Sequence, residues 1–397
     1  MNKIPNGWEE KRLDDLFKEF TEKNHADKNI LASTQDRGVI PSDLLDRHII
    51  RKKESLSNYK LVKKGCFVIS LRSFQGGFEY SNYEGIISPA YTILEPKMKL
   101  VDDFYKYYFK SYYFINKSLP KYAEGIRDGK QIKYKACKEI LVPYPPLDEQ
   151  KRIASALSKI DAYLENTIKL IEEKERFKRG IAKKLLTCKE GENIPEARFK
   201  GFEDEWMEVA ISKIGTIITG NTPSTKNESF WNGNNVWVTP TDIKQKYISN
   251  SERKLTDDGL KKSRKLPANT LLITCIASIG KNAILKCEGA CNQQINAIIP
   301  NKNYNVDFLY YLFENEKSYL KFKAPQSVIK IMSKSEFSKL VFKFPLLEEQ
   351  EKIGGYLSLL DKEIDNLKKQ KELIKEMKRG AMQKLLSGEV RLVYNYG

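Results

Sequence analysis

Two stretches of the chain carry the hydrophobic spacing of long helices. In the middle of the chain, apolar residues recur at intervals of four and three, with polar residues between them, at Ile153, Leu157, Ile160, Leu164 and Ile171. Near the end of the sequence the same intervals connect Ile353, Leu357, Leu360, Ile364, Leu367 and Ile374. Such spacing is typical of helices that pack along their length. We predict that these residues form the seam of a coiled coil.

The ends of both stretches also favour helices. Prolines at 145–146 and 345 precede them, acidic residues occupy the first turn, and lysine and arginine gather toward the end, as the helix dipole favours. Roughly 40 residues at ~1.5 Å each make a rod of about 60 Å. Two such helices cover each other's apolar face if they pair antiparallel, which would place the preceding regions at opposite ends, related by an approximate two-fold axis. The alternative is that each is an ordinary core helix of its own domain.

The two stretches are copies of one sequence. LDEQKRIASALSKID at 147–161 returns as LEEQEKIGGYLSLLD at 347–361, a shift of 200 positions. The regions before them are less similar, but their matches keep the same order: Trp8 aligns with Trp206, CFVIS with TLLIT, and SPAYTILEP with NQQINAIIP. A period this long indicates two copies of one module rather than a solenoid.

The regions before the helices contain short β-branched and aromatic runs separated by Gly, Asn and Pro, a pattern typical of strands. Each also contains one predicted helix, DDFYKYYFKSYYF at 102–114 and VDFLYYLFENEKSYL at 306–320. The fold class we predict is α+β, with two globular domains related by a pseudo-two-fold axis and separated by two long antiparallel helices. The expected boundaries are 1–145 and 191–345 for the globular domains, and 146–190 and 346–392 for the helical regions.

Charge narrows the choice of partner. The chain has 69 Lys and Arg against 52 Asp and Glu, a formal net charge of +17. Such a surplus attracts polyanions, so nucleic acid is the first candidate and an anionic membrane the second. No apolar run approaches the ~18 residues of a membrane-spanning helix, and the N-terminus lacks the apolar segment of a signal peptide. We therefore expect a soluble cytoplasmic protein.

Catalytic motifs are missing from the sequence. Its six cysteines are scattered without a CxxC pair and only two histidines occur, so we predict no metal site and expect buried, reduced thiols. There is no GxxxxGK[ST] phosphate loop. Pro143-Tyr144-Pro145-Pro146 resembles the loop of a DNA methyltransferase only in the wrong order. The sequence indicates a binding protein and not an enzyme.

At the repeated PPLDEQ and PLLEEQ segments, nearly the whole chain resembles the specificity (S) subunits of type I restriction-modification enzymes. PEARFKGFEDEW, GNTPSTKNESFWNG and SIGKNAILKCEGACNQQINAIIP, in the second half, are similar to target recognition domains of that family. The first domain departs more from the pattern, starting abruptly at IPNGWEE and carrying SFQGGFEYSNYEGIISPAYTIL in the matching place.

This resemblance implies that each globular domain is a target recognition domain reading one half of a split double-stranded DNA sequence. The helices would set the gap and dock two modification (M) subunits, which bring S-adenosylmethionine. Restriction (R) subunits would bring ATP- and Mg-dependent translocation and cleavage. No cofactor is expected on this chain itself.

Loops rich in residues that bind base edges or phosphates are the candidate DNA contacts. We select Arg72, Ser73, Phe74, Gln75, Arg127, Lys130, Gln131, Thr222, Ser224, Thr225, Lys226, Thr239, Thr241, Ser278, Lys281, Lys330 and Lys334. Asn292-Gln293-Gln294 is interpreted as a strand-edge segment that satisfies backbone groups rather than as an adenine reader. Trp231 and Trp237 are expected in the core. For Lys178-Arg179 and Lys378-Arg379 two roles stay open, either a contact with DNA phosphates or capping of the helix dipole together with ion pairs to partner acids.

A rival hypothesis is a coiled-coil scaffold whose basic surface binds partner proteins or RNA, without sequence-specific reading of DNA. It predicts no gain in sequence-specific DNA affinity when modification subunits are added. A fused restriction-methylation enzyme would need catalytic motifs that the sequence lacks.

Overall fold

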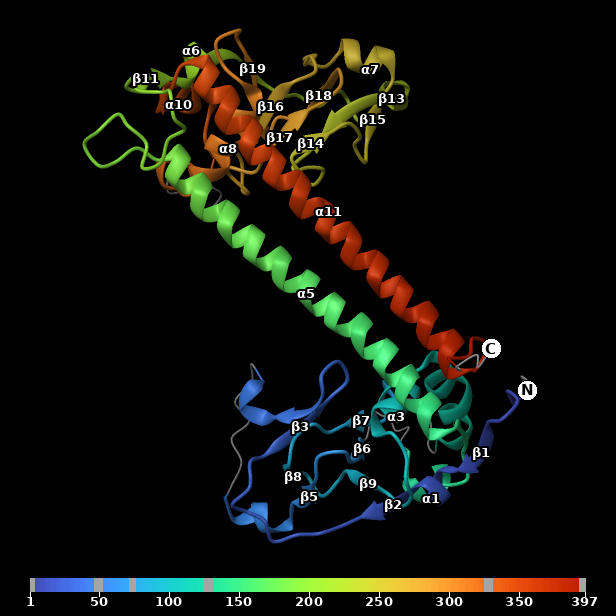
Figure 1. The fold of residues 1–397 in the computed structure, drawn as a ribbon. Helices are drawn as coiled ribbons and strands as arrows, with labels where there is room; N and C mark the ends of the chain where they lie inside the picture. Colours follow the sequence, from blue (N-terminus) through green and yellow to red (C-terminus); the bar gives the residue numbers. More distant parts are fainter. Residues whose placement is uncertain (1–3, 46–52, 71–75, 124–131, 325–330, 393–397) are drawn as a thin grey trace, which may run out of the picture. The chain divides into compact units, whose positions relative to one another are not determined.

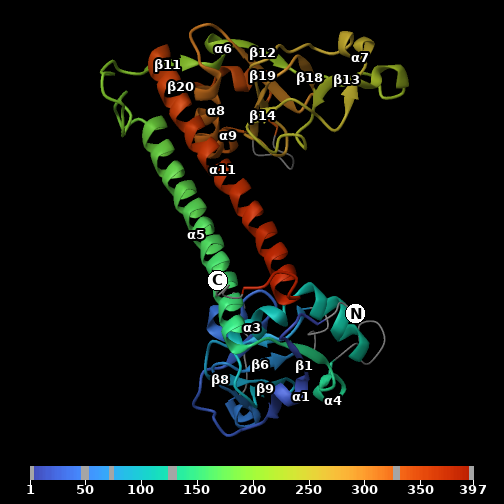
Figure 2. The ribbon, with the colours of Figure 1, turned by 45° about the vertical axis from the view of Figure 1, so that its right-hand side comes forward.

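The computed structural model describes residues 4–45, 53–70, 76–123, 132–324 and 331–392. The chain divides into two compact units. The first contains Met1–Ile168 together with Lys369–Gly397, and the second contains Lys169–Lys368. Each unit therefore combines one globular domain with part of each long helix, α5 (Leu147–Leu186) and α11 (Leu347–Leu386). Figures 1 and 2 show α5 in green and α11 in red as two long helices.

The first globular domain is built on an antiparallel sheet in the order β2-β9-β6-β7. Smaller pairs join β1 to β10, β3 to β4 and β5 to β8. The strands are β1 (Glu9–Arg12), β2 (Phe17–Phe20), β3 (Leu31–Thr34), β4 (Gly38–Pro41), β5 (Lys60–Val62), β6 (Phe67–Ile69), β7 (Glu79–Tyr80), β8 (Gly85–Ile87), β9 (Thr92–Pro96) and β10 (Leu141–Tyr144). The α-helices are α1 (Leu13–Leu16), α3 (Asp102–Tyr108) and α4 (Tyr134–Cys137). Short 3-10 helices form η1 (Ser42–Leu44), η2 (Lys53–Asn58) and η4 (Leu119–Tyr122), and a π-helix forms η3 (Phe114–Ser118).

The second globular domain has a five-stranded sheet in the order β12-β19-β16-β17-β14 and a three-stranded sheet β15-β13-β18. Its strands are β11 (Met207–Ala210), β12 (Gly215–Thr219), β13 (Trp231–Val238), β14 (Tyr247–Ile248), β15 (Lys254–Leu255), β16 (Thr270–Thr274), β17 (Asn282–Leu285), β18 (Gly289–Cys291), β19 (Ile295–Pro300) and β20 (Val341–Phe344). Its helices are α6 (Ile211–Ile214), η6 (Glu228–Phe230), α7 (Asp257–Lys261), α8 (Val306–Asn315), α9 (Lys317–Lys323) and α10 (Lys334–Lys339).

The two domains share one strand order, because β2-β9-β6-β7 corresponds to β12-β19-β16-β17 in the predicted alignment. In each, an amphipathic helix covers the sheet, α3 in the first and α8 in the second. The aromatic residues Phe104, Tyr105 and Phe109 belong to the first core, while Phe308 and Phe313 belong to the second. Most aromatic residues of both runs thus pack in the cores, although Tyr112 and Tyr113 are exposed. The α+β class with two like domains is confirmed.

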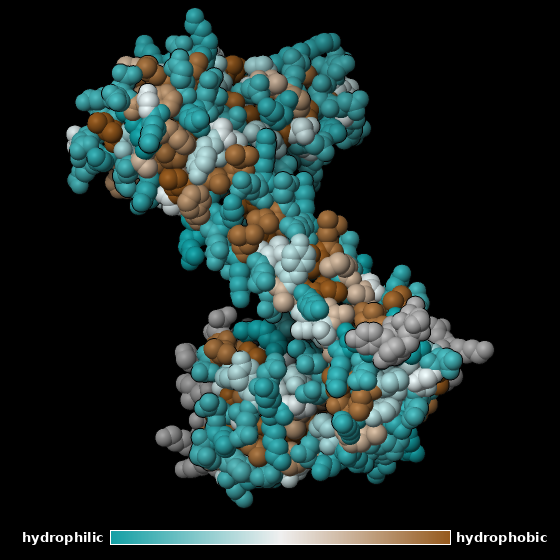
Figure 3. Space-filling view, in the orientation of Figure 1, coloured by the Kyte–Doolittle hydropathy of each residue, from teal (hydrophilic) through white to brown (hydrophobic). Residues whose placement is uncertain are grey.

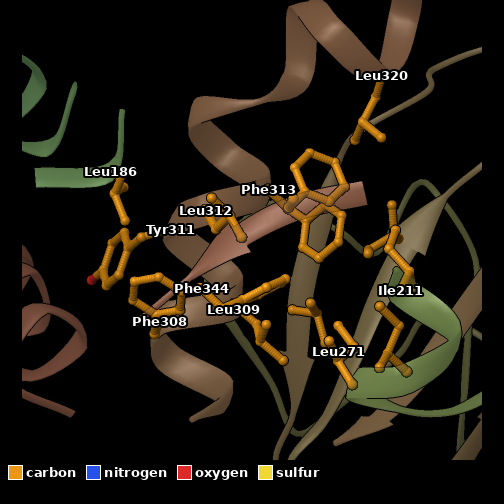
Figure 4. Packing of buried hydrophobic residues seen from close by; sticks show 14 of the residues in the cluster. Leu186, Ile211, Leu271, Phe308, Leu309, Tyr311, Leu312, Phe313, Leu320 and Phe344 are labelled. Atoms are coloured by element: carbon orange, nitrogen blue, oxygen red, sulfur yellow. The ribbon is translucent and has the colours of Figure 1, made fainter. Parts of the chain in front are cut away.

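Both predicted helices are divided, and the one expected at 102–114 forms α3 only as far as Tyr108, with η3 beginning at Phe114. The segment at 306–320 was expected to be continuous, but α8 ends at Asn315 and α9 begins at Lys317. The change of direction brings Leu320 into the same core cluster as Leu309 and Phe313 (Figure 4). Burial of one more leucine, worth ~1.5–3 kcal/mol, favours the break over a straight helix.

Within each unit the segments of α5 and α11 run antiparallel. In the first unit Asp161 pairs with Lys378 at 2.5 Å, while Tyr163 accepts a hydrogen bond from Gln370. In the second, Lys174 pairs with Glu363 at 2.6 Å and Glu175 with Lys368 at 2.7 Å. In the first unit, residue numbers rise along α5 as those of their partners fall along α11, as antiparallel pairing requires.

The apolar residues of the predicted seam lie in two environments. Ile153 and Leu157 are fully buried in the first globular core, where Leu385 and Leu386 from the end of α11 join them. Ile353, Leu357 and Leu360 occupy the corresponding place in the second core, with Leu185 and Leu186. Ile160, Leu164 and Leu367 are partly buried, and Ile171, Ile364 and Ile374 are buried. The start of each helix therefore belongs as much to its globular domain as to the helix pair.

Each long helix is anchored at its first turn by a buried Glu-Gln pair. Glu149 accepts hydrogen bonds from Trp8 Nε1 (2.9 Å) and from Arg391 Nε and Nη2 (both 2.7 Å). Gln150 donates to the Pro145 carbonyl at 2.7 Å and accepts from the Val101 amide at 2.9 Å. These bonds connect the helix start, the globular domain and the end of the chain.

The second helix repeats the anchor. Glu349 accepts from Arg198 Nε (2.9 Å) and Nη2 (2.7 Å) and from Trp206 Nε1 (3.3 Å). Gln350 donates to the Pro345 carbonyl at 2.9 Å and accepts from the Asn305 amide at 3.0 Å. The repeated sequence thus encodes a buried anchor, which the hydrophobic pattern alone did not reveal.

No helix among the described residues is both long enough and apolar enough to pass through a lipid bilayer.

Candidate nucleic-acid interface

The main sheet of the second domain gathers its loops at one edge. Because β12, β19, β16 and β17 alternate in direction, the end of β12, the start of β19, the end of β16 and the start of β17 lie at the same edge. Thr219, Ile295, Thr274 and Asn282 mark these strand ends. The loops 220–230, 275–281 and 292–294 therefore emerge together.

A second pair of strands adds one more loop to this edge. β13 and β18 are parallel, so both end at the same side, at Val238 and Cys291. The Asn292 amide donates to the Val238 carbonyl at 2.9 Å, and the Asn221 amide donates to the Cys291 carbonyl at 3.0 Å. Loop 239–242 is thereby placed beside loops 220–230 and 292–294. We call these four loops the loop edge of the second domain.

Four candidate DNA contacts lie in the first of these loops. Thr222, Ser224, Thr225 and Lys226 are all exposed. The Trp231 indole donates to the Ser224 carbonyl at 3.1 Å, which ties the loop to the buried strand β13. The side chains are thus held on a fixed backbone while their polar groups face outward.

Thr239 and Thr241 form a tight polar turn after β13. Their hydroxyls lie 2.8 Å apart, and Thr239 donates from its amide (2.8 Å) and hydroxyl (2.7 Å) to Asp242. The Asp242 carboxylate also accepts from the Glu252 amide at 2.8 Å. These threonines are therefore on the loop edge, but the hydroxyl of Thr239 is engaged within the turn.

Ser278 and Lys281 lie in the β16–β17 connection. The Thr274 hydroxyl donates to the Ser278 carbonyl at 2.5 Å and accepts from the Lys281 amide at 3.0 Å, which fixes the turn. Lys281 is exposed and Ser278 is half-buried.

Lys334 is an exposed residue beside the same connection. It opens α10 directly after the N-cap Ser333. A bridge between Ile276 and Ile331 brings this segment to the turn, so Lys334 joins the loop edge. Lys330 lies outside the described residues.

Sequence reasoning treated Asn292-Gln293-Gln294 as one unit, and the structure divides it. Asn292 is buried and its carboxamide bonds the Gln294 amide (3.1 Å) and side chain (2.9 Å), the backbone-satisfying role that was expected. Gln293 is exposed, and its Oε1 accepts the Thr222 hydroxyl at 2.5 Å. Gln293 is a candidate contact that the selection above lacks, and its position between the end of β18 and the start of β19 was the available signal.

Trp231 and Trp237 are buried, as expected. Their rings meet edge to face with centroids 5.0 Å apart, and the Arg253 guanidinium lies 3.8 Å from the Trp231 ring centroid. Their indole N–H groups both donate to backbone carbonyls, of Ser224 and Asn221. They support the loop edge from beneath and do not present a face for base stacking.

In the first domain, the ends of β2 and β6 and the starts of β9 and β7 share the corresponding edge. Arg72, Ser73, Phe74 and Gln75 belong to the β6–β7 connection, but they lie outside the described residues, as do Arg127, Lys130 and Gln131. Their candidate roles stay predictions.

Beside the β6–β7 connection, Lys110 Nζ pairs with buried Glu79 at 2.5 Å and donates to the Gly76 carbonyl at 2.8 Å. Burial raises the pKa of Glu79, although the charge of Lys110 opposes this. An equivalent polar pair in the second domain joins Asn282 to Glu314 at 2.9 Å. A part-buried polar contact therefore connects the edge to α8 in the second domain and to the segment after α3 in the first.

The described residues contain no cluster of three or more His, Cys, Asp or Glu suited to a metal. The cysteines are free thiols, and burial raises the pKa of Cys137, Cys275 and Cys291 to about 12, so these three stay protonated and unreactive.

Comparison with known proteins gives a consistent match. The family model described as the type I restriction modification DNA specificity domain matches residues 5–173 and 203–376. The chain is 36% identical over 180 residues to the MjaIX specificity subunit of Methanocaldococcus jannaschii, spanning 44% of this chain and 42% of that protein. It is 25% identical to the putative MjaX specificity subunit of the same organism, over 99% of this chain and 96% of that one.

The fold also matches a solved structure. The HsdS subunit of Thermoanaerobacter tengcongensis superposes with a TM-score of 0.58, covering 98% of each chain at 16% identity. At this identity the likeness concerns the fold alone.

Proposed function

Because this chain belongs to the family of type I restriction-modification DNA specificity subunits, and has two target recognition domains, we propose that each domain reads one half of a bipartite DNA target. In such systems the catalytic activities reside in the modification and restriction subunits. The chain's own part is recognition, and we place it in the cytoplasm, where its target DNA would lie.

The observation that supports this proposal is the loop edge. Thr222, Lys226, Lys281 and Lys334 come from three separate segments, which the antiparallel strand order and the Ile276–Ile331 bridge bring to one side of the second domain. The first domain has the same strand order. A duplicated edge of polar loops suits two similar but non-identical DNA words.

The two kinds of contact have different physical roles. Lysines such as Lys226 and Lys281 suit phosphates, where they add affinity that falls with salt and does not depend on sequence. Thr222 and Gln293 suit base edges in the major groove, where hydrogen bonds distinguish one base pair from another. The net charge of +17 favours the salt-dependent phosphate contacts, and the loops would supply the sequence-specific base contacts.

We assign the paired helices to docking of two modification subunits and to setting the gap between half-sites. Large apolar side chains are exposed along α5 at seven-residue spacing, at Tyr163, Leu170 and Phe177. Figure 3 shows hydrophobic residues at the surface of the helical part of the chain. Phe177 and Met377 occupy equivalent positions and are 51% and 49% exposed, which suits two copies of one partner.

The cofactors of the system would be bound by the partner subunits and not by this chain. S-adenosylmethionine would be brought by the modification subunits, and ATP with Mg by restriction subunits. Double-stranded DNA is the ligand of this chain.

Methylation mapping tests the proposal. In a host that expresses the chain with its modification subunit, methylated sites should share two short defined words separated by a fixed unspecified gap. Exchanging residues 1–145 for another domain of the family should change one word only. A continuous palindromic site would contradict the proposal. If methylation were absent and DNA affinity unchanged by added modification subunits, the scaffold or RNA-binding alternative would be favoured.

A further inference from the structure

In the first unit, three elements meet at one carboxylate. Tyr107 of α3 donates its hydroxyl to Asp161 Oδ2 at 2.8 Å, and Lys378 of α11 lies 2.5 Å from Asp161 Oδ1. Lys378 Nζ is also 5.8 Å from the centroid of the Tyr107 ring. Asp161 belongs to α5, so its two carboxylate oxygens connect this helix to α3 of the globular domain and to the opposite helix, α11.

The second unit repeats this contact with the helices exchanged. Tyr311 of α8 donates to Asp361 Oδ2 at 2.5 Å, and Lys178 of α5 pairs with Asp361 Oδ1. Lys178 Nζ lies 5.3 Å from the centroid of the Tyr311 ring. The Asp and Lys residues of the two units correspond at the shift of 200, and the tyrosines hold equivalent places on equivalent helices. The ion-pair role left open for Lys178 and Lys378 is therefore the one the structure shows.

One further residue strengthens the second junction. Lys246, which precedes β14, uses its three N–H donors on Asp307 (2.6 Å), Ser358 (2.6 Å) and the Tyr311 hydroxyl (3.1 Å). Burial lowers the pKa of Lys246, and the neighbouring Asp307 opposes that shift. Ser358 belongs to α11, so Lys246 adds a second connection between the recognition domain and the helix.

We propose that these Tyr–Asp–Lys junctions are positioning residues, which hold each recognition domain at a fixed orientation to its helix pair and so restrict the target to one gap length. The inference rests on the proposed bipartite function. A recognition domain that tilts on its helix moves its base contacts along the duplex, where neighbouring base pairs are only ~3.4 Å apart. A loose junction would therefore admit neighbouring gap lengths.

The tyrosine is the decisive member of each junction. Each junction lysine has a second acidic side chain within one helical turn of its aspartate partner. Glu165 lies four residues after Asp161, and Asp365 lies four residues after Asp361, and both are exposed. An ion pair alone therefore leaves two registers of similar energy. The buried tyrosine hydroxyl holds Asp161 or Asp361 in place. Burial, followed by the hydrogen bond to the aspartate, raises the pKa of both phenols, which keeps them neutral donors.

The test uses the full chain with its modification subunits and a set of DNA substrates that differ only in gap length. Y107F removes one hydroxyl and leaves the ring in the core, while D161N removes the charge that holds Lys378. We expect methylation at gaps one base pair shorter or longer to rise roughly 10-fold relative to the preferred gap, because contacts of one network are strongly coupled. Both words should stay unchanged.

Matched controls lie one turn away. E165Q makes the same charge change on α5 and should leave the gap preference unaltered. In the second unit D361N should relax the preference less than D161N does, because Lys246 still connects the domain to Ser358. D365N is its control. A double variant, Y107F with D161N, should relax the gap no further than the stronger single variant, since both act through one bond.

The possible outcomes separate the two proposals. If the unaltered chain methylates a bipartite site with one gap, and Y107F and D161N keep that gap equally strict while remaining folded by thermal denaturation, the junction inference is wrong and the bipartite function stands. If the unaltered chain shows no bipartite site, the proposed function itself is wrong. A variant that fails to fold is replaced by K378Q, which changes a half-buried side chain of the same junction.

Discussion

At the scale of single residues, Gln293 and Thr222 form the best-defined candidate contact with a base. The Thr222 hydroxyl occupies one lone pair of Gln293 Oε1 at 2.5 Å, which leaves the second lone pair and the amide N–H groups for a ligand. A glutamine presented in this way matches the N6 and N7 atoms of adenine. Holding the side chain before binding reduces the entropy that binding costs.

We expect Q293A to weaken discrimination at a single position of the word read by the second domain, by ~1–3 kcal/mol. Q293E should favour cytosine there, because a carboxylate accepts from its N4 amino group. Methylation mapping measures both effects, and the other word serves as an internal control. Equal weakening of every position in both words would instead assign Gln293 to the phosphates.

A second residue-scale prediction concerns the buried anchor. Burial alone would raise the pKa of Glu149, but hydrogen bonds from Arg391 and Trp8 outweigh it, and the pKa is lowered from 4.5. A lowered pKa means that ionised Glu149 stabilises the fold above about pH 4.5 and that this stabilisation is lost as the pH falls further. E149Q should reduce stability by ~2 kcal/mol at pH 7 and by progressively less below pH 4.5. Denaturant unfolding at several pH values measures this, with exposed D148N as the control.

At the scale of elements, hydrophobic spacing predicts where the long helices lie, but not what each helix face packs against. The 4-3 interval marked α5 and α11, because any buried helix face repeats with that period. It did not distinguish a helix partner from a globular core, so Ile153 and Leu157 were assigned to a seam although they pack with Phe104 and Leu386 in one cluster. The anchor could not be found from local pattern, since Glu149 and Arg391 are 242 positions apart.

An insertion tests the helices as a spacer. Seven residues added to both α5 and α11 at their unit boundaries, after Ile168 and after Lys368, lengthen each by ~10.5 Å. We expect the gap between half-sites to grow by about three base pairs at ~3.4 Å each, with both words unchanged. An unchanged gap would show that the helices do not measure the distance. Insertion into α5 alone should reduce binding, because it shifts the register of the pair.

At the scale of the whole molecule, the two modules are completed by segments that follow different helices. Arg198, after α5, binds the anchor of the second unit, and Arg391, after α11, binds the anchor of the first. Arg391 also donates to the Asn6 carbonyl at 2.6 Å. The sequence repeat predicted two equal modules. It did not predict that the first module is completed by the segment after α11, which contains Arg391.

Arg391 and Arg198 should each affect the reading of a different DNA word. R391A should weaken reading of the word assigned to the first domain, and R198A that of the second, each leaving the other word within roughly two-fold of its original affinity. Binding to DNA carrying one intact and one scrambled word measures each half separately. Identical losses on both words for either variant would contradict the assignment.

The closure of the first unit by residues beyond 368 has a consequence for synthesis on the ribosome. A multidomain chain usually folds from its N-terminus onward, yet here the second unit, ending at Lys368, is complete before the first. A chain truncated after Lys368 and released should therefore resist protease across the second unit while the beginning of the chain stays open to cleavage. The domain that is translated first would be the one that finishes folding last.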